Sequence, residues 1–252
     1  MDFVKMEGLG NDFIVLVDVT PKPDQVAQWC DRRQGIGADG VLVVSQLESG
    51  RVRMEYWNAD GSRAEMCGNG LRCVARFAYD QGWTEDRSFT VVTDLGDHPV
   101  EVKESGRVRA MLGRSQAPDE ALITVAGTEV RPMSLGNPHA VVFVDNTSDA
   151  PVRTLGPMIE VADEFPDHAN VEFVEVKDRS RIDVRTWERG VGETLACGTG
   201  AGAAAVVANR EGLTDDALTV GLVGGDLEVE IDGETVWMEG PANYVFEGRL
   251  ST

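Results

Sequence analysis

The hydrophobic positions of this chain fall mostly into short runs that are typical of β-strands. Such runs predict strands within 3–18, broken at 8–11, and at 41–44, 51–57, 89–92, 100–103 and 107–112. Later runs predict strands at Val130, 140–144, 171–176, 182–187, 227–231, 235–239 and 244–246. Helical spacing predicts helices over 23–33, 68–79 and 198–209. We expect Asp24 to be the N-cap of the first helix and Gly82 to end the second.

The second half of the chain repeats the first at an offset of 130 residues. Residues 51–70 (RVRMEYWNADGSRAEMCGNG) align without a gap with residues 181–200 (RIDVRTWERGVGETLACGTG). The two copies share an arginine, a tryptophan, a cysteine and two glycines at matching positions. Earlier in the chain, residues 40–44 align with residues 170–174 at the same offset, and residues 10–15 align with residues 136–141 after a small change of offset.

This repeat predicts an α+β fold made of two topologically similar halves that are related by pseudo-two-fold symmetry. We expect each half to be a mostly antiparallel sheet wrapped around one central helix. The expected halves are 1–114 and 115–243, with 244–252 a candidate to return to the first half. Residues 115–120 are the most linker-like stretch, and we expect the active site in the cleft between the halves.

The charge of the chain argues against two classes of partner. There are 43 acidic and 23 basic residues, a net charge of -20, so nucleic acid and anionic membranes are poor candidates. Only four of the basic residues are lysines, and an acidic, lysine-poor surface is typical of proteins that work in high salt. The alternative is an ordinary acidic bacterial enzyme.

The chain carries no feature that predicts export or a membrane anchor. It starts without a basic stretch followed by an apolar one, and its longest small-apolar run, 201–208, is too short to span a bilayer. We therefore expect a cytoplasmic protein without membrane or nucleic-acid partners. The four cysteines show no Cys-x-x-Cys spacing and are expected to be thiols in a reducing compartment.

The repeated cysteines stand where chemistry is expected. In each copy, Cys67 or Cys197 is followed by Gly-x-Gly at the start of a helix. Unpaired amides and the helix dipole favour an anion there and lower the pKa of a cysteine at the same place. A thiol and a thiolate on opposite sides of an α-carbon form a general acid and a general base, and the amides would stabilise the developing negative charge.

Single residues of these types are more often structural than functional. A lone cysteine at a helix start is usually a buried, inert residue, but a pair at matching repeat positions favours function. Cys30 and Cys73 have no cysteine as repeat mate, and we predict that they are structural. A lone asparagine is more often a turn residue, Arg189 could form a surface ion pair, and His139 alone is slightly more often structural.

Taken together, these motifs resemble those of the diaminopimelate epimerase family. The resemblance covers nearly the whole chain. It includes residues 6–13 (MEGLGNDF), 35–37 (GIG), 58–62 (NADGS), 67–70 (CGNG), 135–139 (LGNPH), 187–190 (WERG), 192–200 (GETLACGTG) and 224–227 (GGDL).

The resemblance implies a function and a set of site residues. The family interconverts LL- and meso-2,6-diaminopimelate for lysine synthesis through two cysteines, without pyridoxal phosphate or metal, and is usually homodimeric. It makes Cys67 the proton donor and Cys197 the acceptor in the LL-to-meso direction, and it associates His139 and Glu188 with catalytic competence. The implied substrate-binding residues are Asn11, Asn58, Gly68, Asn69, Asn137, Asn170, Glu188, Arg189, Gly198 and Thr199.

Two positions depart from the family pattern. Many members have a glutamine where this chain has Gly40, the repeat mate of Asn170, so a ligand contact from the first half would be missing or supplied by water. The family's C-terminal tyrosine near the dimer contact corresponds to Phe246.

Two other functions fit parts of the pattern. A cofactor-independent proline or hydroxyproline racemase would need no clamp for a second carboxylate, and Arg189 with its neighbouring asparagines argues against it. A non-catalytic zinc or redox module is disfavoured because the cysteines lack ligand spacing, although facing thiols could also close to a disulfide.

Overall fold

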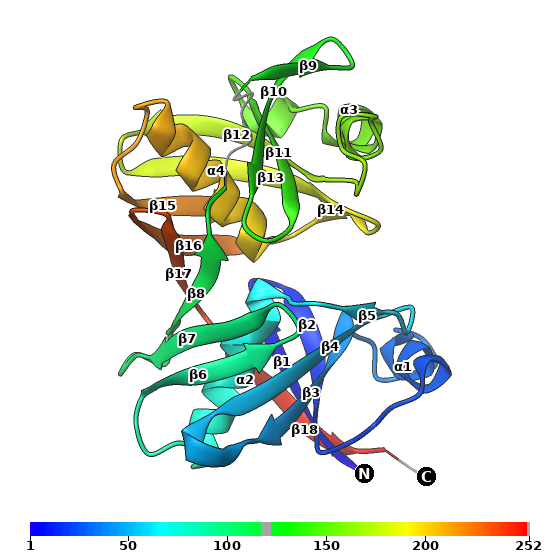
Figure 1. Ribbon diagram of the computed structural model, residues 1–252. Coiled ribbons are helices and arrows are strands. Elements are labelled where there is room, and N and C mark those ends of the chain that lie inside the picture. The colour runs from blue at the N-terminus through cyan, green and yellow to red at the C-terminus, as the bar shows by residue number, and fades with distance from the viewer. Residues whose placement is uncertain (117–121, 251–252) are drawn as a thin grey trace. The chain divides into compact units, whose positions relative to one another are not determined.

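The computed structural model describes residues 1–116 and 122–250, which form two compact units. The first unit contains Met1–Ala110 and the chain from Gly240 onward, and the second contains Met111–Glu239 (Figure 1). Most of the expected linker at 115–120 lies outside the described residues.

The first unit is a mixed sheet with two helices. Its pairings run in the order β18-β1-β2-β3-β4-β6-β7-β8, and β5 pairs with the end of β4. The β2/β3 and β4/β6 pairs are parallel and the others are antiparallel. The strands are β1 (Asp2–Gly8), β2 (Asn11–Val17), β3 (Gly40–Gln46), β4 (Val52–Asn58), β5 (Arg63–Ala64), β6 (Ser88–Thr93), β7 (Gly96–Val102), β8 (Val108–Arg114, which continues into the second unit after Ala110) and β18 (Asn243–Arg249), and the helices are α1 (Pro23–Cys30) and α2 (Gly68–Asp80).

The second unit has the same topology. Its pairings run β9-β10-β11-β12-β13-β15-β16-β17, with β14 beside the end of β13, and its parallel pairs are β11/β12 and β13/β15. The strands are β9 (Ile123–Val125), β10 (Thr128–Ser134), β11 (Pro138–Phe143), β12 (Asn170–Asp178), β13 (Arg181–Glu188), β14 (Gly192–Thr194), β15 (Ala217–Leu222), β16 (Gly225–Asp232) and β17 (Thr235–Gly240), and the helices are α3 (Val152–Glu160) and α4 (Gly198–Arg210). Short 3-10 turns occupy Glu48–Gly50 and Thr147–Asp149.

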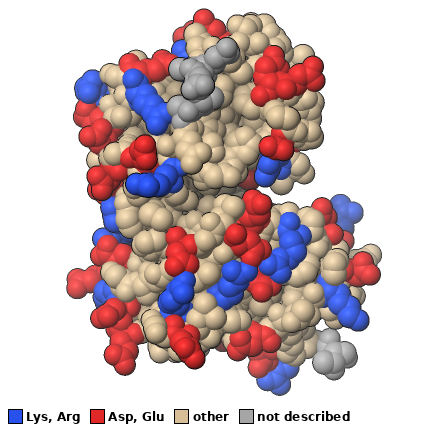
Figure 2. Space-filling view, in the orientation of Figure 1, with Lys and Arg blue, Asp and Glu red and all other residues tan. Residues whose placement is uncertain are grey.

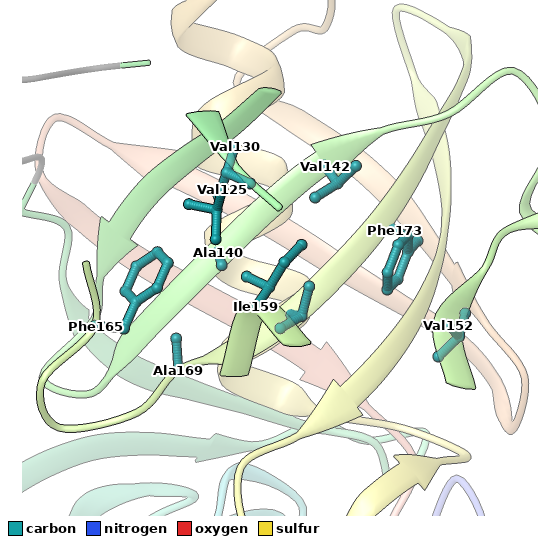
Figure 3. Packing of buried hydrophobic residues seen from close by; sticks show 10 residues of the cluster. Val125, Val130, Ala140, Val142, Val152, Ile159, Phe165, Ala169 and Phe173 are labelled. Carbon is teal, nitrogen blue, oxygen red and sulfur yellow. The ribbon is translucent and has the colours of Figure 1, made fainter. Parts of the chain in front are cut away.

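The central strands of each sheet are buried on both faces, which explains why most of their residues are apolar. In β3, Val41 and Val43 pack with α1, whereas Leu42 contacts Gly70 at the start of α2. In β12, Val171 and Phe173 pack with α3 in the cluster shown in Figure 3. The intervening residue of β12, Glu172, contacts Gly200 at the start of α4, so the same alternation holds in both units.

The α+β fold with two halves of one topology is confirmed, but several details were wrong or missed. Lys22, not Asp24, is the N-cap of α1, because Pro23 fixes the first helical position and keeps the residue before it extended. Gly82 ends α2 as predicted, with a positive φ of 69°. Helix α3, its Pro157 included, was not predicted, nor were the strands β5, β9, β14 and β15.

Among the described residues, every helix is too short or too polar to cross a bilayer. Acidic side chains are spread over the face of the molecule shown in Figure 2, with basic side chains between them. Several of these charges form ion pairs at the surface, such as Arg51 with Asp97 and its repeat counterpart Arg181 with Asp226.

Candidate active site

Cys67 stands at the start of α2 in the first unit. It is the extended N-cap residue, with φ of -138°, and its carbonyl accepts the first helical hydrogen bond from the amide of Leu71. The amides of Gly68 and Asn69 therefore have no acceptor within the helix. The side chain of Cys67 is half-buried. This geometry places a sulfur and a set of helix-end amides together.

Asn11 connects this cysteine to the first strands of the unit. The thiol of Cys67 donates a hydrogen bond to Asn11 Oδ1 at 3.6 Å, and Asn69 Nδ2 donates to the same oxygen at 3.2 Å. Asn11 Nδ2 in turn donates to Asp39 Oδ2 at 2.9 Å. Since an amide oxygen accepts and does not donate, this arrangement suits a protonated Cys67.

Asn11 rests on an ion-pair network that extends from the buried Lys5 to the exposed Arg32. Lys5, which is 5% exposed, pairs with Asp12 Oδ2 at 2.7 Å, and Arg32 pairs with both Asp12 and Asp39 at 2.7 Å. Burial alone would raise the pKa of Asp12, but hydrogen bonds from Arg32 and then Lys5 lower it from its usual 3.8 to about 2. Asp12 therefore stabilises the fold above its unfolded pKa, and this contribution is lost as the pH falls from about 4 to 2.

We expect Asp12→Asn to lower the free energy of unfolding at pH 7 by about 3 kcal/mol, because it leaves the Lys5 ammonium buried without its counter-charge. Urea unfolding followed by circular dichroism measures this change. The variant should also lose less stability than the wild type between pH 4 and pH 2. The double variant Lys5→Met/Asp12→Asn should recover part of the loss, and equal stabilities of the single and double variants would contradict the buried-pair argument.

Cys197 stands in the matching position at the start of α4 in the second unit. It is again an extended N-cap residue, with φ of -116°, but here its sulfur accepts a hydrogen bond from the amide of Gly200 at 3.3 Å. Its sulfur also lies 3.6 Å from Thr199 Oγ1, which accepts from Asn137 Nδ2 at 3.3 Å. Cys197 is 7% exposed, so the two repeated cysteines have different surroundings.

The expected lowering of the cysteine pKa is wrong for Cys197. Burial raises the pKa of this thiol well above its usual value, and the carboxylates of Glu188 and Glu172 raise it further. The hydrogen bonds from Thr199 and Gly200 act in the opposite direction and do not outweigh these effects. Cys197 therefore rests as a thiol, and it can act as a base only after it has lost its proton.

His139 is fully buried beneath α4 and is held at both ring nitrogens. Its Nδ1 lies 2.9 Å from Glu172 Oε1, and its Nε2 lies 3.1 Å from Asn137 Oδ1. His139 and Glu172 are each 0% exposed. A side chain at Gly200 would lie 2.6 Å from Glu172 Oε1 and 3.2 Å from the sulfur of Cys197, which shows how closely the carboxylate approaches the end of the helix.

The turn between β13 and β14 carries Glu188 and Arg189. Glu188 accepts a hydrogen bond from Thr194, and the amide of Arg189 donates to Asn170 Oδ1 at 3.0 Å. The exposed guanidinium of Arg189 donates to the carbonyl of Asp167 at 3.0 Å. Glu160 holds the turn against α3, because it accepts from the amide of Gly190 and from the indole of Trp187, both at 2.7 Å.

The matching turn in the first unit contains Asn58, whose side chain donates to Ser62 Oγ at 3.0 Å. Gly40 pairs with Asn58 in the sheet, and a side chain at Gly40 would lie 2.6 Å from the ring of Tyr56. The backbone carbonyl of Trp57 is closer still, so this carbonyl and the Tyr56 ring already fill the place of a longer side chain at position 40. From the sequence we expect a ligand contact from position 40 to be missing, and the structure shows that the space for such a side chain is filled and not empty.

The structure groups the expected site residues within each unit. Around Cys67 lie Asn11, Gly68 and Asn69, with Asn58 on the neighbouring turn. Around Cys197 lie Asn137, His139, Gly198 and Thr199, and the turn with Glu188 and Arg189 is bound to Asn170. Sequence reasoning missed Lys5, Asp12, Asp39, Glu160 and Glu172, which hold these residues in place.

The remaining cysteines do not stand at a helix start: Cys30 is the last residue of α1, and Cys73 lies inside α2. Cys30 and Cys73 are buried, as predicted, and burial raises the pKa of their thiols to about 11 and about 12. Within residues 1–116 and 122–250, no group of three or more histidine, cysteine, aspartate or glutamate side chains has the arrangement of a metal site.

Comparisons with known proteins agree with this geometry. The family model of diaminopimelate epimerase matches residues 3–118 and 132–245. A diaminopimelate epimerase from Moorella thermoacetica is 43% identical and one from Leptospira biflexa is 40% identical, with 98% and 99% of each chain covered. A PhzF-family phenazine biosynthesis protein from Bacillus anthracis has the same fold, with a TM-score of 0.76 at 18% identity over 100% of this chain and 99% of that chain. This chain belongs to the diaminopimelate epimerase family.

Proposed function

We infer that this protein is an isomerase that interconverts LL- and meso-2,6-diaminopimelate, a reaction of lysine biosynthesis. The observation that carries the proposal is the pair of repeated cysteines, Cys67 and Cys197, each at the N-terminus of the central helix of its unit. The identity to curated diaminopimelate epimerases over nearly the full chain supports the choice of substrate.

We propose a two-base mechanism in the LL-to-meso direction. The Cys197 thiolate removes the α-proton and becomes a thiol, and the Cys67 thiol gives its proton to the opposite face and becomes a thiolate. The hydrogen bond from Cys67 to Asn11 Oδ1 supports the donor role, because it suits a thiol. Since Cys197 rests as a thiol, its proton must first pass to a base, and the Glu188 carboxylate that raises its pKa is the candidate.

The substrate would lie in a cleft between the two halves, 1–114 and 115–243, with a helix start on each side. The amides of Gly68–Asn69 and Gly198–Thr199 would bind the reacting carboxylate and stabilise the charge that develops on it. The asparagines of both units, with Glu188 and Arg189, would bind the ammonium groups and the second carboxylate. The reaction so described needs no cofactor or metal.

Incubation of the purified protein with LL-diaminopimelate in deuterated water tests this function. The expected result is loss of the α-proton NMR signal together with formation of the meso isomer. L-Proline and trans-4-hydroxy-L-proline are the control substrates, because a hydroxyproline epimerase from Agrobacterium vitis shares this fold with a TM-score of 0.73 at 14% identity. Exchange on proline but not on diaminopimelate would overturn the assignment.

Arg189→Lys should raise the KM for diaminopimelate by about 30-fold or more, because loss of a charge-assisted contact costs about 2–5 kcal/mol. The reason is that a point charge replaces the planar fork that binds a carboxylate at two points. Steady-state kinetics over substrate concentrations from below KM to saturation separates KM from kcat. Arg179→Lys is the matched control, since Arg179 pairs with Asp215 at the surface of the same unit. A normal KM with a lowered kcat would show that Arg189 is not the distal clamp.

We also propose that the protein is a homodimer of the cytoplasm and works in high salt. The dimer is supported by β18, which exposes Tyr244, Val245 and Phe246 by 39%, 53% and 47% on a strand whose described partner is β1. Such an apolar strand is an ordinary element of a protein interface. The four cysteines occur as thiols, as expected in a reducing compartment.

A further inference from the structure

Glu172 is the one charged residue within the buried part of its strand, and the matching position of the first unit is apolar. Its repeat mate in the first unit is Leu42, which contacts Gly70 as Glu172 contacts Gly200. Likewise, Phe13 of the first unit stands where the second unit has His139, since each is the residue that pairs with the start of the next strand. The two units therefore have the same backbone arrangement at these positions, but the first unit has the apolar pair Phe13 and Leu42 and the second has the buried pair His139 and Glu172.

The second carboxylate oxygen of Glu172 makes the charge costly. Oε2 is buried without a hydrogen-bond partner among the described residues, and so is Oγ1 of Thr186, which faces Glu172 across the sheet. An unsatisfied buried carboxylate oxygen lowers stability, and apolar replacements of buried ion pairs are often neutral or stabilising. Stability of the fold therefore does not explain why a glutamate occupies this position.

The hydrogen bonds of His139 show what Glu172 does instead. Asn137 Nδ2 donates to Thr199, so Asn137 Oδ1 faces His139 Nε2 and requires a proton on that nitrogen. His139 Nδ1 meets Glu172 Oε1, and one further proton lies between these two atoms.

These contacts form a series of hydrogen bonds that ends at the sulfur of Cys197. His139 Nε2–H donates to Asn137, Asn137 Nδ2–H donates to Thr199, and the Thr199 hydroxyl reaches Cys197 Sγ at 3.6 Å. Hydrogen bonds given to a sulfur favour its thiolate form. The donor-to-acceptor direction of all these hydrogen bonds depends on a proton at Nε2 of His139. Glu172 fixes the orientation of the ring that carries this proton.

We propose that Glu172 is a positioning residue of the epimerase. It holds the His139 ring and its Nε2 proton, and through Asn137 and Thr199 it directs hydrogen-bond donors toward Cys197. The role in catalysis rests on the proposed function, whereas the state of the His139 ring does not.

The first test determines by NMR which nitrogens of the His139 ring carry a proton, and it needs no substrate. Nitrogen-15 NMR of protein labelled at its three histidines should show His139 with a protonated Nε2, assigned by its loss in His139→Phe, which copies Phe13. In Glu172→Gln, which keeps the shape and removes the charge, the Nδ1 signal should change and those of His98 and His168 should not. An unprotonated Nε2 in the wild type would overturn the proposal.

The second test is a double-mutant cycle on epimerisation. Glu172→Gln should lower kcat by about 10–100-fold with KM nearly unchanged, as the loss of an outer-shell partner does elsewhere. In the His139→Phe background the same change should have no further effect on kcat, because Glu172 acts through His139. The matched control is Glu175→Gln on the same strand, where the carboxylate binds Thr147 and Lys177 away from α4.

Stability and activity should separate in the variant His139→Phe/Glu172→Leu, which copies the first unit. Its melting temperature should equal or exceed that of the wild type while epimerisation falls to the level of His139→Phe alone. Additive losses in the cycle, or a strongly lowered melting temperature of this variant, would show that Glu172 is structural. An inactive wild type with a normal His139 NMR spectrum would refute the proposed function and leave the ring assignment intact.

Discussion

Cys67→Ala and Cys197→Ala are each expected to lower epimerisation of diaminopimelate by at least about 10²–10⁴-fold, because a positioned acid or base contributes that much. Each variant loses the acid/base group for one face of the α-carbon, and no second base replaces it. Both variants should fold, because alanine removes a single sulfur atom at a helix start and leaves the backbone of the helix unchanged. Formation of the meso isomer, measured by chiral chromatography, checks the result.

Serine variants and the other cysteines sharpen this test. A serine hydroxyl is far less acidic than a thiol, so Cys67→Ser and Cys197→Ser should also fail at epimerisation. Elimination from a substrate analogue with a good β-leaving group needs one base and should survive in part in one of them. Cys30→Ala and Cys73→Ala should keep epimerase activity, although their burial makes some loss of stability expected. Epimerisation at the wild-type rate by either alanine variant would refute the two-base mechanism.

The architecture could be predicted because the repeat and the hydrophobic runs agree. Apolar runs such as 41–44 and 140–144 fit strands that are buried on both faces, and the Gly-x-Gly motifs mark two helix starts at matching positions. Helix α3 was not predicted, because Gly156 and Pro157 weaken a helical pattern of only nine residues. The repeat contained the missing signal, since α1 shifted by 130 residues falls on α3.

The polar contacts beneath the site could not be predicted, because they join residues that are distant in sequence. Glu172 lies 33 residues from His139, and in the sequence it is one polar position in an apolar strand. Comparison with Leu42 at the same repeat position would have marked it as unusual. Lys5 and Asp12 likewise form a pair only after β1 and β2 have come together.

The pKa of Cys197 shows a second limit of sequence reasoning. The helix start was visible in the sequence and favours a thiolate, but the burial of the sulfur and the nearness of Glu188 and Glu172 were not. These effects are larger than the hydrogen bonds from Thr199 and Gly200, so the net direction is reversed. The sign of a pKa shift therefore depends on packing that only the folded chain reveals.

The melting temperature of the protein should rise by about 10 °C between 0.01 M and 1 M potassium chloride, over which the Debye length falls from about 30 Å to about 3 Å. The net charge of -20 is the cause. Two like charges about 10 Å apart in water repel by about 0.4 kcal/mol, and ten such pairs amount to about 4 kcal/mol. For a protein of this size each kcal/mol moves the melting temperature by about 2–4 °C. Differential scanning calorimetry across the salt series measures the shift.

A charge-neutralised variant separates this effect from any general action of salt on the folded state. Glu85, Asp86, Asp163 and Glu164 are exposed and belong to no ion pair found among the described residues, two in each unit. Their replacement by the matching amides makes the net charge less negative without removing an ion pair. The variant should therefore have a higher melting temperature at low salt, and its melting temperature should depend less on salt. Chloride must be used rather than sulfate, because sulfate strengthens apolar burial in any protein. A melting temperature that is flat or falling in the wild type would refute the high-salt proposal, and an equal salt dependence in the variant would show that surface repulsion is not its cause.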